Sequence, residues 1–444
     1  MAPLPDNLVR TVAFSLYVLW LAAFPMSGPL LEVHGDMTWF LWPHIAALLL
    51  CARCRPGTFA LLLRGGTLSS ALTTLLWIPL DNTHANLVLA VAGIASAPTS
   101  IYMGLLLKGG WQPVLLAALG LACGNLLLVG LGYLPFSAHV QLALLAGALP
   151  GLLLAPPPRA GYMLGPTPGL YRYLPFVVCF QLVSGLMYGH MLPVYGEVGV
   201  LPGSELLFYA ASAVAVAGLS VRNRETTLFV GVFVAMLAYA IWHFLPSPLA
   251  EHAGMFTMMM AAGIIDVFLL AYALSYTNVL RAYGHAVAAL VGGIAGGYHL
   301  SASIGQASQT VSLFALILLN LAVLAMLAIQ RSHAASVIMP AMPETPMPEE
   351  TLPLEMPPPP SGLPAALAEL LSEQERQVLL RMLRHRTYKE VAAELQISES
   401  SVKTYIQRVY RKTGVFRRSQ LLGLIRGEVP LPATSKSQWP PSLS

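Results

Sequence analysis

Charged residues are scarce in this sequence: Asp, Glu, Lys and Arg together make up only 10% of its 444 residues. Soluble domains usually contain about 25%. Cysteine is scarce too, with four residues, too few for a disulfide scaffold of this length. Hydrophobic residues account for 56% of the chain, and a soluble globule could not bury that much apolar surface. The composition excludes a disordered protein, a disulfide scaffold and an ordinary cytosolic enzyme, and places most of the chain in lipid.

Patterns typical of a hydrolase, a kinase or a metalloenzyme are also missing, so we predict no enzymatic activity, no metal and no cofactor. Cys51 and Cys54 have the spacing of a metal or redox pair. No second Cys or His pair accompanies them, and they end an apolar run. We interpret them as ordinary residues at the end of a membrane helix.

Apolar runs long enough to cross a bilayer recur up to residue 330 and predict twelve membrane-spanning helices. Arg64, Gly65 and Gly66 set the expected start of the third span. The expected fold class is all-α, with a polytopic twelve-helix bundle. Its spans are expected at 10–31, 37–53, 66–80, 86–107, 113–133, 139–155, 173–193, 204–221, 226–245, 254–275, 283–301 and 311–330.

The loop charges predict how these spans are oriented. With the N-terminus in the cytoplasm, all eleven basic residues up to residue 335 fall on the inner side. The outer side receives acidic residues and no Lys or Arg, as the positive-inside rule requires. We therefore expect a multi-pass protein of the inner, cytoplasmic membrane with both termini in the cytoplasm. The inner residues are Arg10, Arg53, Arg55, Arg64, Lys108, Arg159, Arg172, Arg222, Arg224, Arg281 and Arg331, and the outer ones are Glu32, Asp36, Asp81, Glu197, Glu205 and Glu251.

The longest inner loop of this part, from Pro156 to Arg172, divides the spans into six and six. Two six-helix halves joined by a central cytoplasmic loop resemble the major facilitator architecture. The resemblance rests on the number of spans and their topology. The family's basic motif between the second and third spans is missing at residues 52–57, which lack its acidic partner. The resemblance implies a transporter-like fold, and the missing motif argues against active transport.

Asp266 lies in the middle of an expected span, where a carboxylate costs about 3 kcal/mol to insert. Such a residue should face the bundle interior, a cavity or a partner, so it is a candidate ligand contact or proton-titrating group. The alternative is a hydrogen-bonded structural acid. His44, Asn125, Gln181 and His243 are weaker candidates, because a single His or Asn in a bundle often serves as an interhelical hydrogen bond.

Charge and proline divide the chain into parts. Residues 1–335 form the expected membrane domain, and residues 336–363 form an acidic, proline-rich linker that should be extended or disordered. Residues 364–427 form a small domain and 428–444 a disordered tail. Residues 364–444 hold thirteen Lys and Arg against seven Asp and Glu, a net charge of +6. A basic domain suggests a polyanionic partner.

The small domain has closely spaced helix-start signals. Ser372 with Glu375, and Thr387 with Glu390, have the spacing of capping boxes, and Ser398 is placed to cap a third helix. Gly414 is expected to end that helix, and a fourth helix follows over Leu421 to Ile425. The short segment 395–398 between the second and third helices matches the spacing of a helix-turn-helix.

This domain resembles the LuxR/FixJ/NarL-type DNA-binding domain over its whole length and with the expected four helices. The resemblance implies a helix-turn-helix regulator whose third helix enters the major groove of double-stranded DNA, with two copies pairing on the DNA. It puts Lys403, Thr404, Gln407 and Arg408 at the DNA face, and flanking phosphates would be neutralised by Arg411, Lys412, Arg417 and Arg418. The matching residues are Leu371, Ser372, Glu375, Arg376, Val378, Leu379, Thr387, Lys389, Glu390, Val391, Ala392, Leu395, Ile397, Ser398, Val402, Lys403, Tyr405, Val409, Tyr410, Lys412, Gly414, Val415 and Arg418.

The sequence thus predicts a membrane-anchored, one-component transcription regulator. Its membrane domain would sense a signal or small ligand, and its cytoplasmic domain would bind DNA. A transporter with a regulatory tail that binds DNA or protein is the alternative hypothesis, and a sensor whose tail binds a protein partner is a third.

Overall fold

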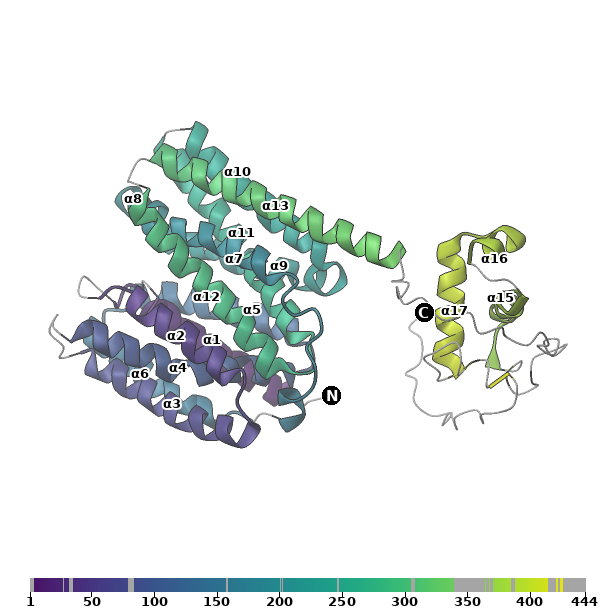
Figure 1. The fold of residues 1–444 in the computed structure, drawn as a ribbon. Helices are drawn as coiled ribbons and strands as arrows, with labels where there is room; N and C mark the ends of the chain where they lie inside the picture. The colour runs from purple at the N-terminus through teal and green to yellow at the C-terminus, as the bar shows by residue number, and fades with distance from the viewer. Residues whose placement is uncertain are drawn as a thin grey trace, which may run out of the picture. The chain divides into compact units, whose positions relative to one another are not determined.

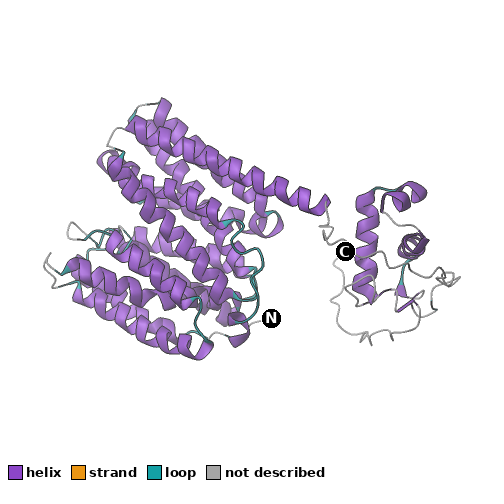
Figure 2. Cartoon of the chain, in the orientation of Figure 1, coloured by secondary structure: helices purple, strands orange, loops and turns teal. Residues whose placement is uncertain are grey.

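The computed structural model describes 4–26, 28–31, 35–78, 84–156, 159–199, 201, 203–245, 247–304, 308–338, 364, 367, 370–384, 388–413, 421, 424 and 425. Regular structure in these residues is helical throughout, as Figure 2 shows, which confirms the expected all-α class. The chain divides into two compact units, Met1–Met342 and Pro343–Ser444. The expected linker lies outside the described residues except for 336–338, which end a long helix, and the expected tail lies outside them entirely.

The membrane unit has a helical segment at each of the twelve expected positions, drawn in Figure 1 from purple to green. Among the described residues, nine helical segments are long and apolar enough to cross a membrane, and two shorter segments, Thr38–Cys51 and Ala138–Leu154, are also apolar. The first half contains α1 (Leu4–Ala23), α2 (Thr38–Cys51), α3 (Pro56–Leu76), α4 (Ala85–Lys108), α5 (Pro113–Gly132) and α6 (Ala138–Gly151). The second half contains α7 (Leu174–Leu186), which continues through a π-helical turn (Met187–Met191) into α8 (Leu192–Val198), then α9 (Ser204–Arg222), α10 (Arg224–Phe244), α11 (Pro248–Leu274), α12 (Val279–Ser303) and α13 (Ser308–Ile338).

Two expected span boundaries were wrong. Helix α3 begins at Pro56 rather than at residue 66, because proline is well placed in a first helical turn. Gly66 therefore lies inside the helix, where it allows a close approach to the next helix: a Cβ there would come within 2.4 Å of the Ala95 carbonyl oxygen. Helix α1 ends at Ala23 instead of residue 31, since Pro25 disfavours helical backbone in the residue before it.

The two halves meet mainly along two helix pairs. Helix α2 packs against α12, and α5 packs against α9, so each half contributes one helix to each pair. On the first pair, the Trp42 indole nitrogen donates to His299 Nε2 at 3.2 Å, and the two rings stack with an interplanar angle of 13°. The two halves are thus held by polar and aromatic contacts as well as by apolar packing.

Glycine brings α7 and α12 together. A Cβ on Gly293 would lie 2.5 Å from that of Gln181, and one on Gly297 would lie 1.9 Å from the Leu182 carbonyl oxygen. Gly292, by contrast, has room for a Cβ, which would make only an ordinary contact with Ile45 at 3.8 Å. Gly296 is intermediate, since an added Cβ would lie 3.0 Å from the Leu182 side chain, so Gly293 and Gly297 make the closest approach that small residues permit in membrane helices.

Replacing Gly297 by alanine should destabilise the membrane unit by about 1–3 kcal/mol, because backbone atoms of α7 cannot move aside as a flexible side chain would. Gly292→Ala is the matched control, in the same helix with room for the added carbon. Thermal unfolding of the detergent-solubilised protein measures both. Equal unfolding midpoints for the two variants would contradict this account of the α7–α12 contact.

The C-terminal unit contains α15 (Glu373–Arg384), α16 (Tyr388–Leu395) and α17 (Glu399–Thr413). Leu421, Leu424 and Ile425 are also helical and buried, in keeping with the expected fourth helix. They share one apolar cluster with Leu379 and Val409. A second cluster joins α15, α16 and α17 through Val378, Val391, Ala392, Val402 and Ile406. These two clusters fix the orientation of α17 relative to α15 and α16.

Candidate functional site

Helix α17 has one buried and one exposed face. Val402, Ile406, Val409 and Thr413 are at most 4% exposed and recur at the spacing of one helical stripe. Thr404 and Arg408 lie off this stripe and are exposed. The Arg408 guanidinium stacks 5.7 Å above the ring of Tyr405, which orients it along the helix surface.

The turn before α17 is tight. Gln396 adopts a left-handed backbone with φ of 52°, and Ile397 N–H donates to the Ala392 carbonyl at 3.1 Å. Ser398 then caps α17, its hydroxyl accepting from Ser401 N–H at 3.1 Å, as expected from the sequence. The turn and the cap direct the start of α17 away from α16, which is the arrangement of a helix-turn-helix.

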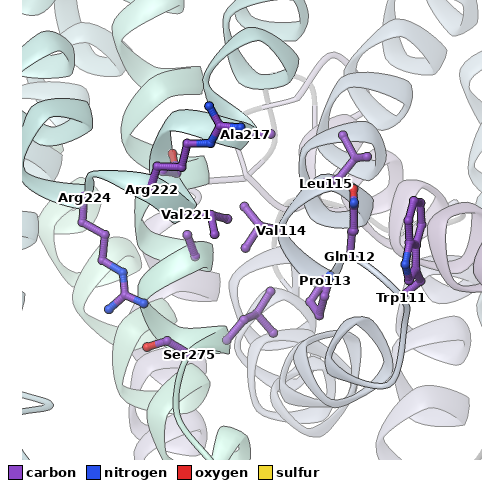
Figure 3. A pocket seen from close by; sticks show the side chains of 14 residues that line it. Trp111, Gln112, Pro113, Val114, Leu115, Ala217, Val221, Arg222, Arg224 and Ser275 are labelled. Carbon is purple, nitrogen blue, oxygen red and sulfur yellow. The ribbon is translucent and has the colours of Figure 1, made fainter. Parts of the chain in front are cut away.

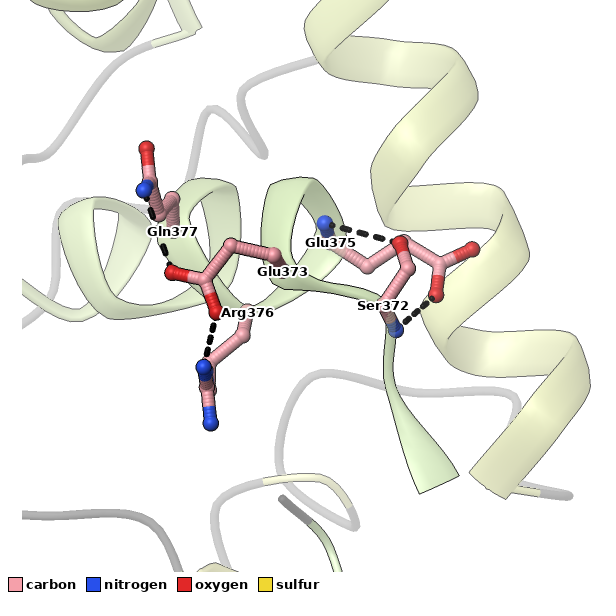
Figure 4. Close-up of polar contacts among 5 residues, drawn as sticks. All are labelled: Ser372, Glu373, Glu375, Arg376 and Gln377. Carbon is pink, nitrogen blue, oxygen red and sulfur yellow. Dashed lines mark hydrogen bonds and ion pairs between the residues drawn. The ribbon is translucent and has the colours of Figure 1, made fainter. Parts of the chain in front are cut away.

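The capping box expected at Ser372 and Glu375 is confirmed (Figure 4). Ser372 N–H donates to Glu375 Oε2 at 2.8 Å, and Glu375 N–H donates to Ser372 Oγ at 3.3 Å. Next to the box, Glu373 pairs with Arg376 and accepts from Gln377 Nε2 at 3.1 Å. Thr387, the cap of the second expected box, and Gly414 lie outside the described residues.

Glu375 also binds α17. Lys412 Nζ donates to its Oε2 at 2.6 Å, and the Glu375 side chain is only 4% exposed. Burial acts to raise the pKa of Glu375, but the hydrogen bonds from Lys412 and Ser372 outweigh it and lower the pKa below its usual value. The pair ties the start of α15 to the end of α17.

This ion pair predicts acid sensitivity. Because the folded-state pKa of Glu375 is depressed, its stabilisation is present above the unfolded value of about 4.3 and is lost as pH falls through the folded value. Glu375→Gln should destabilise residues 364–444 by about 1 kcal/mol at pH 7, since Lys412 is partly solvated. It should also weaken their acid sensitivity.

Urea unfolding at pH 7 and pH 4 measures both effects. Glu373→Gln is the control, because its carboxylate is exposed and its pairing with Arg376 is worth little. A similar loss of stability in the two variants would show that the buried pair has no special role.

The structure brings several expected DNA-face residues onto one helix. Thr404 and Arg408 are exposed. Lys403, Gln407 and Arg411 lie on the same helix, and their side chains are outside the described part of the structure. Lys412 is already engaged with Glu375, although an ammonium keeps two further N–H donors. Arg417 and Arg418 lie outside the described residues.

A second polar site surrounds Asp266 in the membrane unit. Tyr209 Oη, from α9, donates to Asp266 Oδ2 at 2.7 Å, and Gln181 Nε2, from α7, donates to Oδ1 at 3.2 Å. The carboxylate on α11 is thus held by two other helices of the second half, and Asp266 is only half-buried. After Gln181, α7 continues into the π-helical turn Met187–Met191, and such turns are common near functional sites.

Two glycines make this arrangement possible. A Cβ on Gly263 would lie 2.5 Å from the Tyr209 carbonyl oxygen, so glycine lets α9 and α11 approach one turn before Asp266. Gly293 likewise lets α12 approach α7 at Gln181. Gln181 was among the weaker candidates in the sequence, whereas Tyr209 was missed, because nothing in its own helix marks it as facing a carboxylate.

The other intramembrane candidates do not join Asp266. His44 is buried in the first half, with Nδ1 2.9 Å from the Gly93 carbonyl oxygen. Asn125 donates to the Leu121 carbonyl of its own helix at 2.9 Å. His243 Nδ1 lies 2.8 Å from Ser312 Oγ and links α10 to α13. These bonds are the local and interhelical contacts that single polar residues often make in a bundle.

The fold of the membrane unit has a solved counterpart. The human organic anion transporter MFSD10 (TETRAN) superposes with a TM-score of 0.53, and the match covers 73% of this chain and 99% of that one. The sequences are only 14% identical, so the likeness concerns the fold. It confirms the expected resemblance to the major facilitator architecture.

The C-terminal unit has relatives in sequence. Residues 369–424 match the family described as bacterial regulatory proteins, luxR family. The probable transcriptional regulatory protein NarL of Mycobacterium tuberculosis is 44% identical over 55 residues, which are 12% of this chain and only 26% of that protein. The spore germination protein GerE of Bacillus subtilis is 42% identical over 64 residues, 14% of this chain and 86% of that protein. With nearly the whole of such a relative matched, and with its capped helix-turn-helix, this chain belongs to the luxR family of bacterial regulatory proteins.

Proposed function

We propose that this protein is a membrane-anchored, one-component transcription regulator. The observation that carries the proposal is the fusion of a luxR-family domain to a twelve-helix membrane unit within one chain. The exposed face of α17, with Thr404 and Arg408, is the proposed surface for double-stranded DNA. Two copies pair on DNA, because one small reader rarely binds tightly alone.

The proposed location is the inner membrane with both termini in the cytoplasm. Contacts between helix ends support one common inner end. Arg10, near the start of α1, donates to the Leu106 carbonyl near the end of α4, and Lys108 Nζ donates to the Leu274 carbonyl at the end of α11. The positive-inside rule assigns Arg10 and Lys108 to the cytoplasmic side. The start of α1 and the ends of α4 and α11, which these two residues join, are therefore proposed to lie on that side.

The proposed sensing site is centred on Asp266. Its two oxygens accept from Gln181 and Tyr209, and a carboxylate oxygen has capacity for a further donor. A ligand with a hydroxyl, amine or ammonium group suits this arrangement. A ligand that replaces either bond would change how α7, α9 and α11 are held, and so bias the two halves toward one arrangement.

Transport is the second candidate function, because the membrane unit shares its fold with a transporter. Uptake of candidate solutes by vesicles that contain the purified protein tests it. Both resemblances are to proteins other than enzymes, and we assign no catalytic activity.

Genome-wide mapping of the DNA bound by the intact protein tests the regulator proposal. We expect discrete sites that contain paired half-sites. Changing both Lys403 and Arg408 to alanine should weaken binding at those sites, because each good contact to a base is worth about 1–3 kcal/mol.

Arg376→Ala is the matched control, since this arginine lies on α15 and pairs with Glu373. If DNA occupancy were unchanged in the double variant, or lost equally in the control, α17 would not be the DNA-reading helix. If the domain bound a protein partner but no DNA, the third hypothesis, a sensor whose tail binds a protein, would be favoured.

A further inference from the structure

A cavity of about 570 Å³ lies at the junction of the two halves, at the end of the bundle that carries Arg222 and Arg224. It is formed by the start of α5, the ends of α9 and α11 and the first residue of α10. In Figure 3, Val114 and Val221 occupy its middle, with the two arginines on one side and Trp111 and Gln112 on the other. An apolar floor with a polar rim is the usual form of a small-molecule site.

The rim is positively charged. No acidic residue lines the cavity, and neither guanidinium is ion-paired within the described part of the chain. The carbonyl ends of α9 and α11 point toward the same end of the bundle, and Lys108 offsets one of them by binding the Leu274 carbonyl. The two arginines thus remain available for an anion, which guanidinium groups bind through paired N–H donors.

Two further groups favour a polar ligand atom here. Ser220, which lines the cavity, is fully buried, yet its hydroxyl has no hydrogen-bond partner among the described residues. Helix α5 begins at Pro113 without a side-chain cap, so the N–H groups of its first turn lack intrahelical partners. Buried polar groups are normally satisfied, and a bound oxyanion would satisfy both kinds of donor.

The apolar part of the cavity continues onto exposed apolar surface. Val221 is 61% exposed and Trp111 is 56% exposed, and exposed tryptophan at a helix end is typical of the membrane interface. Gly218 lines the same cavity, and a Cβ added there would meet open space. An acyl chain can therefore enter from the bilayer beside Gly218 while its headgroup stays at the arginines.

We propose that this cavity binds one anionic phospholipid from the cytoplasmic leaflet. Arg222 and Arg224 would hold the phosphate, Ser220 would donate to one of its oxygens, and the acyl chain would lie along Val114 and Val221. Basic pockets between membrane helices on the cytoplasmic side are suited to such headgroups. Because α5 belongs to one half and α9 and α11 to the other, the lipid bridges the junction and links membrane composition to the arrangement of the halves.

Native mass spectrometry of the full-length protein tests this proposal. The detergent-purified protein is titrated with dioleoyl phosphatidylglycerol and with dioleoyl phosphatidylcholine. We expect one phosphatidylglycerol to bind with a preference of about 10-fold or more, since only its headgroup has a net negative charge for the arginines. Changing Arg222 and Arg224 to glutamine should abolish the preference.

The matched control changes Arg53 and Arg55 to glutamine, an exposed pair with the same spacing and expected on the same side. Gly218→Leu should lower phosphatidylglycerol occupancy by filling the cavity, whereas Gly130→Leu, also in open space but away from the cavity, should not. An unchanged preference in the Arg222/Arg224 variant, or an equal loss in the Arg53/Arg55 control, would overturn the proposal. Displacement of the lipid by inorganic phosphate alone would also overturn it and assign the site to a free anion.

Discussion

Forcing residues 364–444 into a dimer should tighten their binding to a paired operator by about 100-fold. Each copy presents one helix, α17, and one major-groove helix reads only a few base pairs. Once the first copy is bound, a short link holds the second near its half-site at an effective concentration in the millimolar range. Fluorescence anisotropy on an operator found by genome-wide mapping, with the unit fused to a parallel coiled coil, measures the gain.

The gain should depend on both half-sites. On DNA with a single half-site, the dimerised and monomeric pieces should bind with similar affinity. Arg408→Ala should weaken both forms, and binding of both should fall steeply with salt, because phosphate contacts release counterions. Equal affinity of the two forms for a paired site would mean that pairing does not control this domain.

Asp266→Asn should abolish the response to signal or shift its midpoint by about 10-fold or more, while leaving operator affinity unchanged. The change keeps the size of the side chain but removes the charge that receives the bonds from Tyr209 and Gln181. Hydrogen bonds to charged groups contribute about 1.5–3 kcal/mol, which corresponds to this shift. Reporter output against signal dose, together with DNA binding by the same variant, separates the two effects.

Asn320→Ala is the control for this experiment. Asn320 is also polar and lies within a membrane helix, but it is exposed and donates to the Leu316 carbonyl of its own helix at 2.8 Å. Its loss should leave the response intact. If Asp266→Asn gave an unchanged dose response, the carboxylate would be a structural group that joins α7, α9 and α11.

In the proposed regulator, the signal acts on one unit of the chain and the output comes from the other. The proposed site at Asp266 and the proposed lipid site at Arg222 and Arg224 both include residues of α9 and α11. Helix α9 in turn packs against α5 of the first half. Both could therefore act on the same rearrangement of the halves. If so, the dose response to signal should differ between membranes rich and poor in phosphatidylglycerol.

The sequence by itself determined the fold class, the positions of the twelve helices and the luxR-type domain. Each depends on local information: apolar runs of bilayer length, prolines that start helices, and caps such as Ser372 with Glu375 and Ser398. These signals act over a few residues, so they can be read without knowing which helices touch. They failed at Gly66, where packing against α4 allows a helix to continue through two glycines.

Only the tertiary structure decided which polar groups meet. Asp266, Tyr209 and Gln181 are separated by up to 85 residues, and nothing local relates them. Likewise, the sequence offered Lys412 as a phosphate contact, and the fold brings it to the buried Glu375, which lies 37 residues earlier in the chain. The cavity at Arg222 and Arg224 exists only because helix ends from both halves converge there. Such contacts depend on helix packing angles, which follow from the fit of all side chains together rather than from any one segment.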